Sequence, residues 1–174
     1  WGSPKHSIHR SISARLVPAG IPLLSEEGRA TDYAERRTWS SLWIVDPLDG
    51  TKEFIQRNGE FTVNIALVPA RVPTLGVIYV PVSRELYFAA DGLGAYKLKG
   101  VKSIGPDETA DSLACRAARL PLEQENRDTF VVVASRSHLN PETAEFIEAL
   151  RAKHPHIETV SSGSSIKICL VAEG

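Results

Sequence analysis

The chain has 174 residues, enough for one domain or one and a half at about 100–200 residues per domain. Its hydrophobic content of 43% and charged content of 24% are ordinary for a globular protein, and a net charge of −1 argues against a nucleic-acid polymer or an anionic membrane as partner. No apolar run approaches the ~20 residues that span a bilayer, and no signal peptide is evident. We therefore expect no integral membrane segment and a cytoplasmic location, with peripheral association at the inner membrane as the alternative.

Several residue types are informative by their number or spacing. Methionine is absent, which indicates a fragment or a sequence from which residues have been lost. Cys115 and Cys169 make no disulfide framework and are predicted to be buried free thiols. Four histidines form no metal-binding pattern with acids and are predicted at the surface: His6, His9, His154 and His156.

The first half of the chain predicts one helix followed by strands. Apolar residues spaced by four predict a helix over residues 6–16. A short strand over residues 21–24 leads into Ser25-Glu26-Glu27, and the polar residues 28–37 predict a mobile loop. Further strands are predicted at residues 43–45, 61–68, 75–80, 85–90 and 95–98.

The second half begins with an irregular polar stretch, residues 100–125, predicted to bridge two halves of the molecule. After it, the pattern predicts strands at 130–134 and 157–160, a helix at 141–150 and a helix at 166–173. Asn140 is the expected N-cap of the first of these helices, with a proline at its first position. Ser164 or Ser165 is expected to cap the second. This order predicts an N-terminal layered α+β half, residues 1–99, and a C-terminal α/β half, residues 100–174.

The most informative stretch, residues 43–54, reads Trp-Ile-Val-Asp-Pro-Leu-Asp-Gly-Thr-Lys-Glu-Phe. Asp46 and Asp49 stand at the end of a predicted strand, and the proline between them stiffens the expected turn. Gly50 leaves room for an anion to approach the backbone, and Thr51 adds a hydroxyl. Carboxylates and a carbonyl are hard oxygen ligands that suit Mg²⁺. An isolated Asp-Pro would be only a polar turn, but the whole string favours a metal site.

This string resembles the signature of the inositol monophosphatase superfamily of Mg²⁺-dependent, lithium-sensitive phosphatases. Its continuation through residue 67, the Ser-Arg-Ser-His at 135–138, and the Gly-Ser-Ser-Ile-Lys at 163–167 with residues 169–174 resemble the bacterial CysQ branch. Members of that branch are 3′(2′),5′-bisphosphate nucleotidases. The resemblance spans about residues 2–174. The implied fold is an αβαβα sandwich of the inositol monophosphatase/fructose-1,6-bisphosphatase type, with its cleft between the halves.

The resemblance implies a set of metal and catalytic residues. Glu26, Asp46 and Asp49, with the carbonyl of Leu48, would hold two or three Mg²⁺ ions. Glu26 together with Thr51 would orient the attacking water, and paired ions would activate that water and stabilise the leaving oxygen.

The resemblance also implies a set of substrate-binding residues. These are Gly50, Thr51, Ser135, Ser137, His138, Ser164 and Lys167. A lysine at an apolar helix start is costly to bury unless an anion or acid meets it, which favours a ligand role for Lys167 over a surface lysine. The alternatives are an ordinary helix cap for Ser164 and a loop histidine for His138.

The sequence departs from the family pattern in two places. Ser3-Pro4 runs directly into Lys5-His6, where the family has a Thr-x-Ala-Asp segment. The family's Trp-Asp-x-Ala-Ala-Gly segment would follow Gly174. Each segment carries a metal-binding aspartate. Because every motif that is present is intact, residues missing from the sequence are favoured over a degenerate protein.

The predicted function is hydrolysis of the 3′-phosphate of adenosine 3′,5′-bisphosphate, with 3′-phosphoadenylyl sulfate as a second substrate. The partner is thus a small nucleotide, and the oligomeric state is left open. One alternative is an inositol or other sugar phosphatase of the same superfamily, against which the Lys-Glu-Phe, Ser-x-Ser-His and Gly-Ser-Ser-x-Lys elements stand. The other is a catalytically dead nucleotide- or metal-binding protein.

Overall fold

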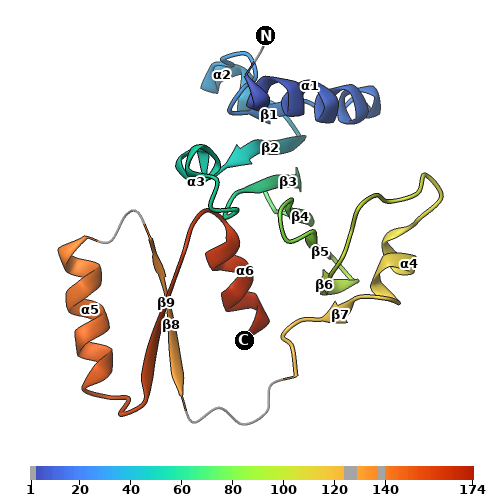
Figure 1. The fold of residues 1–174 in the computed structure, drawn as a ribbon. Helices are drawn as coiled ribbons and strands as arrows, with labels where there is room; N and C mark the ends of the chain where they lie inside the picture. Colours follow the sequence, from blue (N-terminus) through green and yellow to red (C-terminus); the bar gives the residue numbers. More distant parts are fainter. Residues whose placement is uncertain (1–2, 124–128, 137–139) are drawn as a thin grey trace.

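The computed structural model describes residues 3–123, 129–136 and 140–174, which form two sheets and several helices (Figure 1). In chain order the strands are β1 (Leu23–Ser25), β2 (Ser41–Asp49), β3 (Thr62–Pro69), β4 (Leu75–Val80), β5 (Glu85–Ala90), β6 (Gly94–Leu98), β7 (Ala118–Arg119), β8 (Phe130–Ser135) and β9 (Ile157–Ser162). The helices are α1 (Pro4–Leu16), the 3-10 turn η1 (Val17–Ala19), α2 (Tyr33–Arg36), α3 (Thr51–Gln56), α4 (Ala110–Ala114), α5 (Pro141–Arg151) and α6 (Ile166–Glu173). None of the described helices is both long and apolar enough to cross a membrane.

The larger sheet has seven strands in sequence order, β1 to β7. β1 and β2 run parallel, and each later neighbour pairs antiparallel. β7 belongs to this sheet because Ala118 pairs with Lys97 of β6. The division of the chain at residue 99 stays a prediction.

One row of cross-strand partners defines the face of the large sheet that carries the site. Asp46 pairs with Asn64, Asn64 with Ile78, Ile78 with Tyr87, and Tyr87 with Lys97. Side chains directly opposite one another in a sheet project from the same face. An acid of the main motif and a lysine four strands away therefore share one face.

Helix α6 packs on this face. Cys169 is buried against Val80 and Tyr87. At the end of the helix, Glu173 Oε1 accepts hydrogen bonds from the Tyr87 hydroxyl at 2.6 Å and from Lys97 Nζ at 2.7 Å. Apolar packing and a charged anchor together hold α6 against the sheet.

The anchor includes a second carboxylate. Lys97 is 8% exposed and also lies 2.9 Å from Glu85 Oε1. Burial alone would lower the pKa of Lys97, but its hydrogen bonds, led by that to Glu173, raise it. Burial alone would raise the pKa of Glu85, but hydrogen bonds from Lys97 and Ser83 hold it below its ordinary value. Lys97 and Glu85 are therefore both ionised at neutral pH and stabilise each other.

The second sheet and the helices complete the layers. β8 and β9 run parallel, which requires a crossover, and α5 supplies it. Asn140 caps α5 by accepting a hydrogen bond from Thr143 N at 2.8 Å, as predicted. α6 lies between the two sheets, α1 packs on β1 and β2, and α5 is drawn beyond β8 and β9 (Figure 1). The order is helix, sheet, helix, sheet, helix.

The opposite face of β5 holds a second apolar cluster. Leu86 and Phe88 of β5 pack with Leu98 of β6 and Leu113 of α4.

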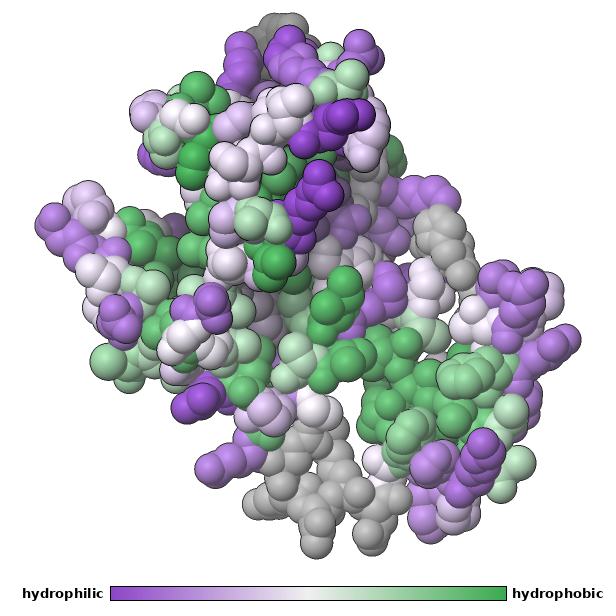
Figure 2. Space-filling view, turned by 180° about the vertical axis from the view of Figure 1, so that it is seen from behind, coloured by the Kyte–Doolittle hydropathy of each residue, from purple (hydrophilic) through white to green (hydrophobic). Residues whose placement is uncertain are grey.

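Seen from behind, apolar surface gathers over the small sheet and its neighbouring helices (Figure 2). The exposed large apolar residues of these elements are Phe130, Phe146, Val160, Ile168 and Val171. Exposed apolar patches of this kind are typical of surfaces that contact another protein or a ligand.

Strand β2 is longer than predicted. The sequence predicted a strand over residues 43–45 and a turn beginning at Asp46, yet β2 continues to Asp49. Pro47 has no N–H to donate, but it lies where the register with β3 shifts between Asp46 and Asp49. An interruption of the ladder is where a strand tolerates proline.

Three further predictions differ from the structure. The loop predicted over residues 28–37 contains the short helix α2, and the irregular stretch over residues 100–125 contains α4 and β7. Cys115 was predicted to be buried but is exposed at the C-cap of α4, two residues after Leu113 of the core; Cys169 is buried as predicted.

Candidate active site

Parallel pairing of β1 and β2 brings the two acidic motifs together. Ser25, the last residue of β1, is the register partner of Val45. Glu26 follows Ser25 and Asp46 follows Val45, so both acids lie at the same edge of the sheet. The carboxyl ends of parallel strands are a common place for ligand sites.

Asp46 is a half-buried acid in a crowded negative environment. Its Oδ1 accepts a hydrogen bond from the backbone N of Leu48 at 3.0 Å. Burial is the main cause that raises the pKa of Asp46, and the charges of Glu26 and Asp49 raise it further. The Leu48 hydrogen bond and the charge of Lys5 act in the opposite direction. The acids thus repel one another in the absence of a cation.

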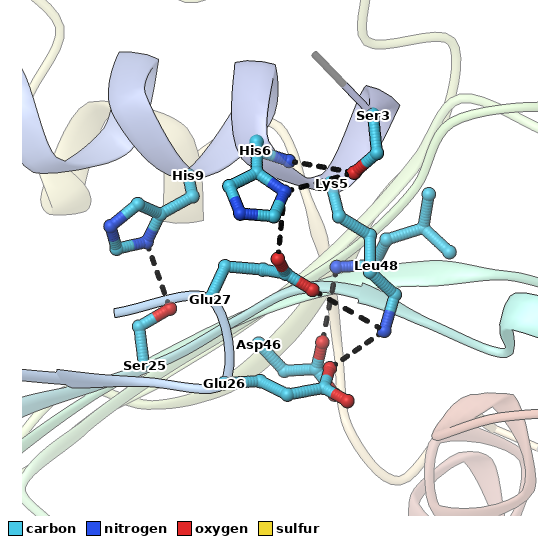
Figure 3. A network of polar contacts seen from close by, with 9 residues as sticks. All are labelled: Ser3, Lys5, His6, His9, Ser25, Glu26, Glu27, Asp46 and Leu48. Carbon is cyan, nitrogen blue, oxygen red and sulfur yellow. Dashed lines mark hydrogen bonds and ion pairs between the residues drawn. The ribbon is translucent and has the colours of Figure 1, made fainter. Parts of the chain in front are cut away.

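Helix α1 places two basic side chains against the acids (Figure 3). Lys5 Nζ lies 2.7 Å from Glu26 Oε2 and 4.0 Å from Glu27 Oε1. His6 Nδ1 lies 2.9 Å from Glu27 Oε2, so His6, although exposed as predicted, does have an acidic partner. Burial alone would lower the pKa of Lys5, but the hydrogen bond and charge of Glu26 outweigh it and raise that pKa.

Two serines help to position α1 at this edge. Ser3 is the N-cap of the helix and accepts a hydrogen bond from the backbone N of His6 at 3.5 Å. One turn later, His9 Nδ1 lies 2.9 Å from Ser25 Oγ at the end of β1 (Figure 3). The start of α1 is thereby tied to the strand that precedes Glu26.

The donor atoms at this edge fit a hard divalent cation. They are carboxylate and carbonyl oxygens, which Mg²⁺ prefers. On β3, next to Asp46, Asn64 Oδ1 is buried and receives no hydrogen bond from the described residues. Among those residues, no three His, Cys, Asp or Glu side chains are gathered as a metal-binding group. Here the Glu26 carboxylate contacts Lys5, and the Asp49 carboxylate contacts Ser165 at the start of α6.

Asp49 joins the acid cluster to the second half of the chain. Its Oδ2 accepts hydrogen bonds from Ser165 N at 2.7 Å and from Ser165 Oγ at 2.6 Å, and Thr62 Oγ1 lies 3.5 Å away. Asn64 Nδ2 also donates to Ser165 Oγ at 2.7 Å. Ser165 is the N-cap residue of α6, but its hydroxyl binds Asp49 rather than a helix N–H. A carboxylate at a helix start is favourable.

A cavity of about 390 Å³ lies beside this contact. Its lining residues are Asp49, Gly50, Thr51, Lys52, Glu53, Ser135, Gly163, Ser164, Ser165, Lys167 and Ile168. They come from the β2–α3 turn, the end of β8 and the start of α6. The volume is within the ~300–1,000 Å³ that small-molecule sites occupy.

Two glycines allow the walls of this cavity to approach closely. Gly50 has φ = +90°, and a Cβ there would lie 3.0 Å from the carbonyl oxygen of Glu60. A Cβ on Gly163 would lie 2.6 Å from Cγ of Glu53, which is 6% exposed. Beside it, Ser164 has the left-handed φ of 47°. Strained backbone of this kind concentrates at functional sites.

Glu60 holds the loop before α6 in place. Its Oε2 accepts a hydrogen bond from Gly163 N at 2.8 Å, and its Oε1 lies 2.6 Å from Arg136 Nη2. The same Arg136 nitrogen donates to the carbonyl of Ser161 at 2.9 Å. One carboxylate thus connects the turn after α3 to β8 and β9.

The predicted residues fall into two adjoining groups. Glu26, Asp46 and Leu48 lie at the strand ends, and Asp49 connects them to the cavity. The predicted substrate residues that line the cavity are Gly50, Thr51, Ser135, Ser164 and Lys167. The Lys167 ammonium donates to the carbonyl of Ser164 at 2.8 Å. Ser137 and His138 lie outside the described residues.

Sequence reasoning did not single out four residues of the site. Lys5, Glu53, Glu60 and Ser165 contact the acids or the cavity walls. Glu53 and Ser165 stand in the Lys-Glu-Phe and Gly-Ser-Ser-Ile-Lys elements, but these elements gave neither residue a role in the site. Lys5 and Glu60 act over long sequence separations, which leave no local pattern.

Comparison with known proteins supports the family resemblance along most of the chain. The sequence profile described as "Inositol monophosphatase family" matches residues 6–174. The chain is 45% identical over 160 residues to 3′(2′),5′-bisphosphate nucleotidase CysQ of Salmonella typhimurium, covering 92% of this chain and 56% of that protein. The chain thus spans about half the length of the curated relatives it matches.

Comparison with solved structures supports the same family and fold. CysQ from Bacteroides thetaiotaomicron, a bacterial member of the inositol monophosphatase family, matches with a TM-score of 0.91 and 57% identity over 98% of this chain and 62% of that one. An IMPase/NADP phosphatase complexed with Mg²⁺ and phosphate matches with a TM-score of 0.65 and 20% identity over 98% and 57%, a likeness of fold alone. The predicted layered sandwich is confirmed, and the chain belongs to the inositol monophosphatase family.

Proposed function

We propose that this protein is a Mg²⁺-dependent phosphatase that removes the 3′-phosphate of adenosine 3′,5′-bisphosphate in the cytoplasm, with 3′-phosphoadenylyl sulfate as a second substrate. The observation that carries the proposal is the junction at Asp49. On one side lie Glu26 and Asp46, and on the other a polar cavity of about 390 Å³. The similarity to proteins named 3′(2′),5′-bisphosphate nucleotidase supports the choice of substrate.

The metal-binding residues in this proposal are Glu26, Asp46, Asp49 and the carbonyl of Leu48, for two or three Mg²⁺ ions. Magnesium, when bound, would supply charge stabilisation at the leaving oxygen and a more acidic water. Glu26 and Thr51 would orient that water toward phosphorus. Cation binding would also relieve the mutual repulsion that raises the pKa of Asp46.

The proposed substrate contacts are Gly50, Thr51, Ser135, Ser137, His138, Ser164 and Lys167. The backbone N–H groups of Gly50 and Thr51 would hold the scissile phosphate. Lys167, at the start of α6, would meet the other phosphate, because its ammonium is kept at the cavity by the carbonyl of Ser164. The metal half, residues 1–99, and the substrate half, residues 100–174, would meet at the cavity.

Steady-state phosphate release by the purified protein tests this proposal. Adenosine 3′,5′-bisphosphate and an inositol monophosphate are compared with and without Mg²⁺, for the wild type, Asp46→Asn and the exposed control Asp91→Asn. We expect Mg²⁺-dependent release from the nucleotide. Asp46→Asn should lose nearly all kcat with the fold intact, because the metal loses a charged ligand while repulsion between acids falls.

Each alternative predicts a different result. Faster turnover of the inositol phosphate would move the protein to the sugar-phosphatase side of the family. Nucleotide binding without turnover of either compound would indicate a catalytically dead binding protein. If Asp46→Asn kept about a tenth or more of wild-type activity at saturating Mg²⁺, the metal assignment would be wrong.

A further inference from the structure

Lys5 occupies the place among the acids where a cation is needed. Its side chain is 17% exposed, and its ammonium lies 2.7 Å from Glu26 Oε2 and 4.0 Å from Glu27 Oε1 (Figure 3). The charge of the ammonium also acts on Asp46. It partly opposes burial and the neighbouring acids, which together raise the pKa of Asp46. One positive charge therefore partly neutralises three carboxylates.

The other charged groups at this edge do not replace Lys5. His6 contacts Glu27 but not Glu26, and its side chain is 59% exposed. Asp49, on the far side of the cluster, is engaged by Ser165. Among the described residues, the Lys5 ammonium is thus the cation in contact with Glu26.

We propose that Lys5 is an internal counter-ion that competes with a divalent cation for Glu26, so that metal binding requires the ammonium to leave. This rests on the proposed function, which makes Glu26 a metal ligand. The same carboxylate oxygen cannot face both cations, and two positive charges a few ångströms apart repel each other.

The local structure permits this exchange. The Glu26 side chain is 56% exposed, so water and ions reach it without unfolding of the sheet. Lysine carries its charge on a flexible four-carbon stem, and its strongly hydrated ammonium can turn to solvent while the stem stays packed.

The expected size of the effect follows from the strength of such a pair. A protein that binds metal only in its open state has an apparent Kd raised by the inverse of the open fraction. An ion pair with one exposed partner favours the closed state by a factor of about 1.4 to 5. Removing the Lys5 charge should therefore tighten Mg²⁺ binding about two- to sixfold.

Isothermal titration of the purified protein with Mg²⁺ alone tests the proposal. Lys5→Met keeps most of the apolar stem and should bind Mg²⁺ more tightly. Lys5→Arg keeps the charge and should bind like wild type, as should Lys102→Met, which removes an exposed lysine elsewhere. Melting curves give a second measure: Lys5→Met should melt below wild type in EDTA, and the deficit should shrink in Mg²⁺.

The outcomes separate this proposal from the proposed function. Unchanged or weaker Mg²⁺ binding by Lys5→Met, with clear binding by wild type, would overturn the role of Lys5 and leave the phosphatase assignment standing. No Mg²⁺ binding by either protein would instead remove the metal site. If Lys5→Met did not fold, Lys5→Gln would replace it; failure of both to fold even in Mg²⁺ would make Lys5 a structural residue and the proposal wrong.

Discussion

Replacing Glu60 by alanine should loosen the wall of the cavity that α6 and its preceding loop provide. Glu60 accepts a hydrogen bond from Gly163 N and pairs with Arg136. Losing the acceptor leaves the N–H of buried Gly163 without its partner, at a cost of about 1–3 kcal/mol. Arg136 is 49% exposed at its side chain, so the lost ion pair adds at most about 1 kcal/mol. We expect a total loss of about 1–4 kcal/mol.

Urea unfolding followed by circular dichroism measures this loss. Glu60→Gln should fall between wild type and Glu60→Ala, because the amide oxygen still accepts from Gly163. Glu148→Ala is the matched control, since Glu148 pairs with Arg151 on exposed α5 and should change stability by less than about 0.5 kcal/mol. A Glu60→Ala variant as stable as this control would refute the bridging role.

The remaining predictions concern the substrate, the pH dependence and the cavity wall. Lys167→Ala should lower kcat/KM about ten- to a hundredfold for adenosine 3′,5′-bisphosphate, because a hydrogen bond to a charged group contributes about 1.5–3 kcal/mol; equal losses on an inositol monophosphate would assign Lys167 to the fold or the scissile phosphate. The lowered pKa of Glu85 means that its bond with Lys97 stabilises the protein above pH 4.5 and that this stability is lost as the pH falls through the lowered value. The difference in free energy of unfolding between wild type and Glu85→Gln, measured by urea unfolding, should therefore shrink from neutral to acidic pH. A difference that stays constant would contradict this role of Glu85. Gly163→Ala should cost about 1–3 kcal/mol in the same assay and raise KM, because its Cβ would overlap Glu53; an unchanged KM would show that this wall does not shape the site.

Much of the fold followed from local patterns. β4 and β5 agree with their predicted bounds, and α5 begins after Asn140 as its capping chemistry requires. These elements were predictable because alternation, helical spacing and caps act within a few residues. Boundaries were missed where pairing overrode the local signal, as when β2 continued through Pro47.

The sequence by itself determined which groups are the candidates for the proposed chemistry: the acids of residues 46–49, the acid after β1, and the hydroxyl and ammonium groups around α6. Their arrangement was decided by tertiary structure. Lys5 contacts Glu26 across 21 residues, and Asp49 meets Ser165 across 116. Such contacts depend on strand register and on how α1 and α6 pack against the large sheet. Local periodicity records which face of its own strand or helix a residue occupies, and only packing selects the distant residue that this face meets.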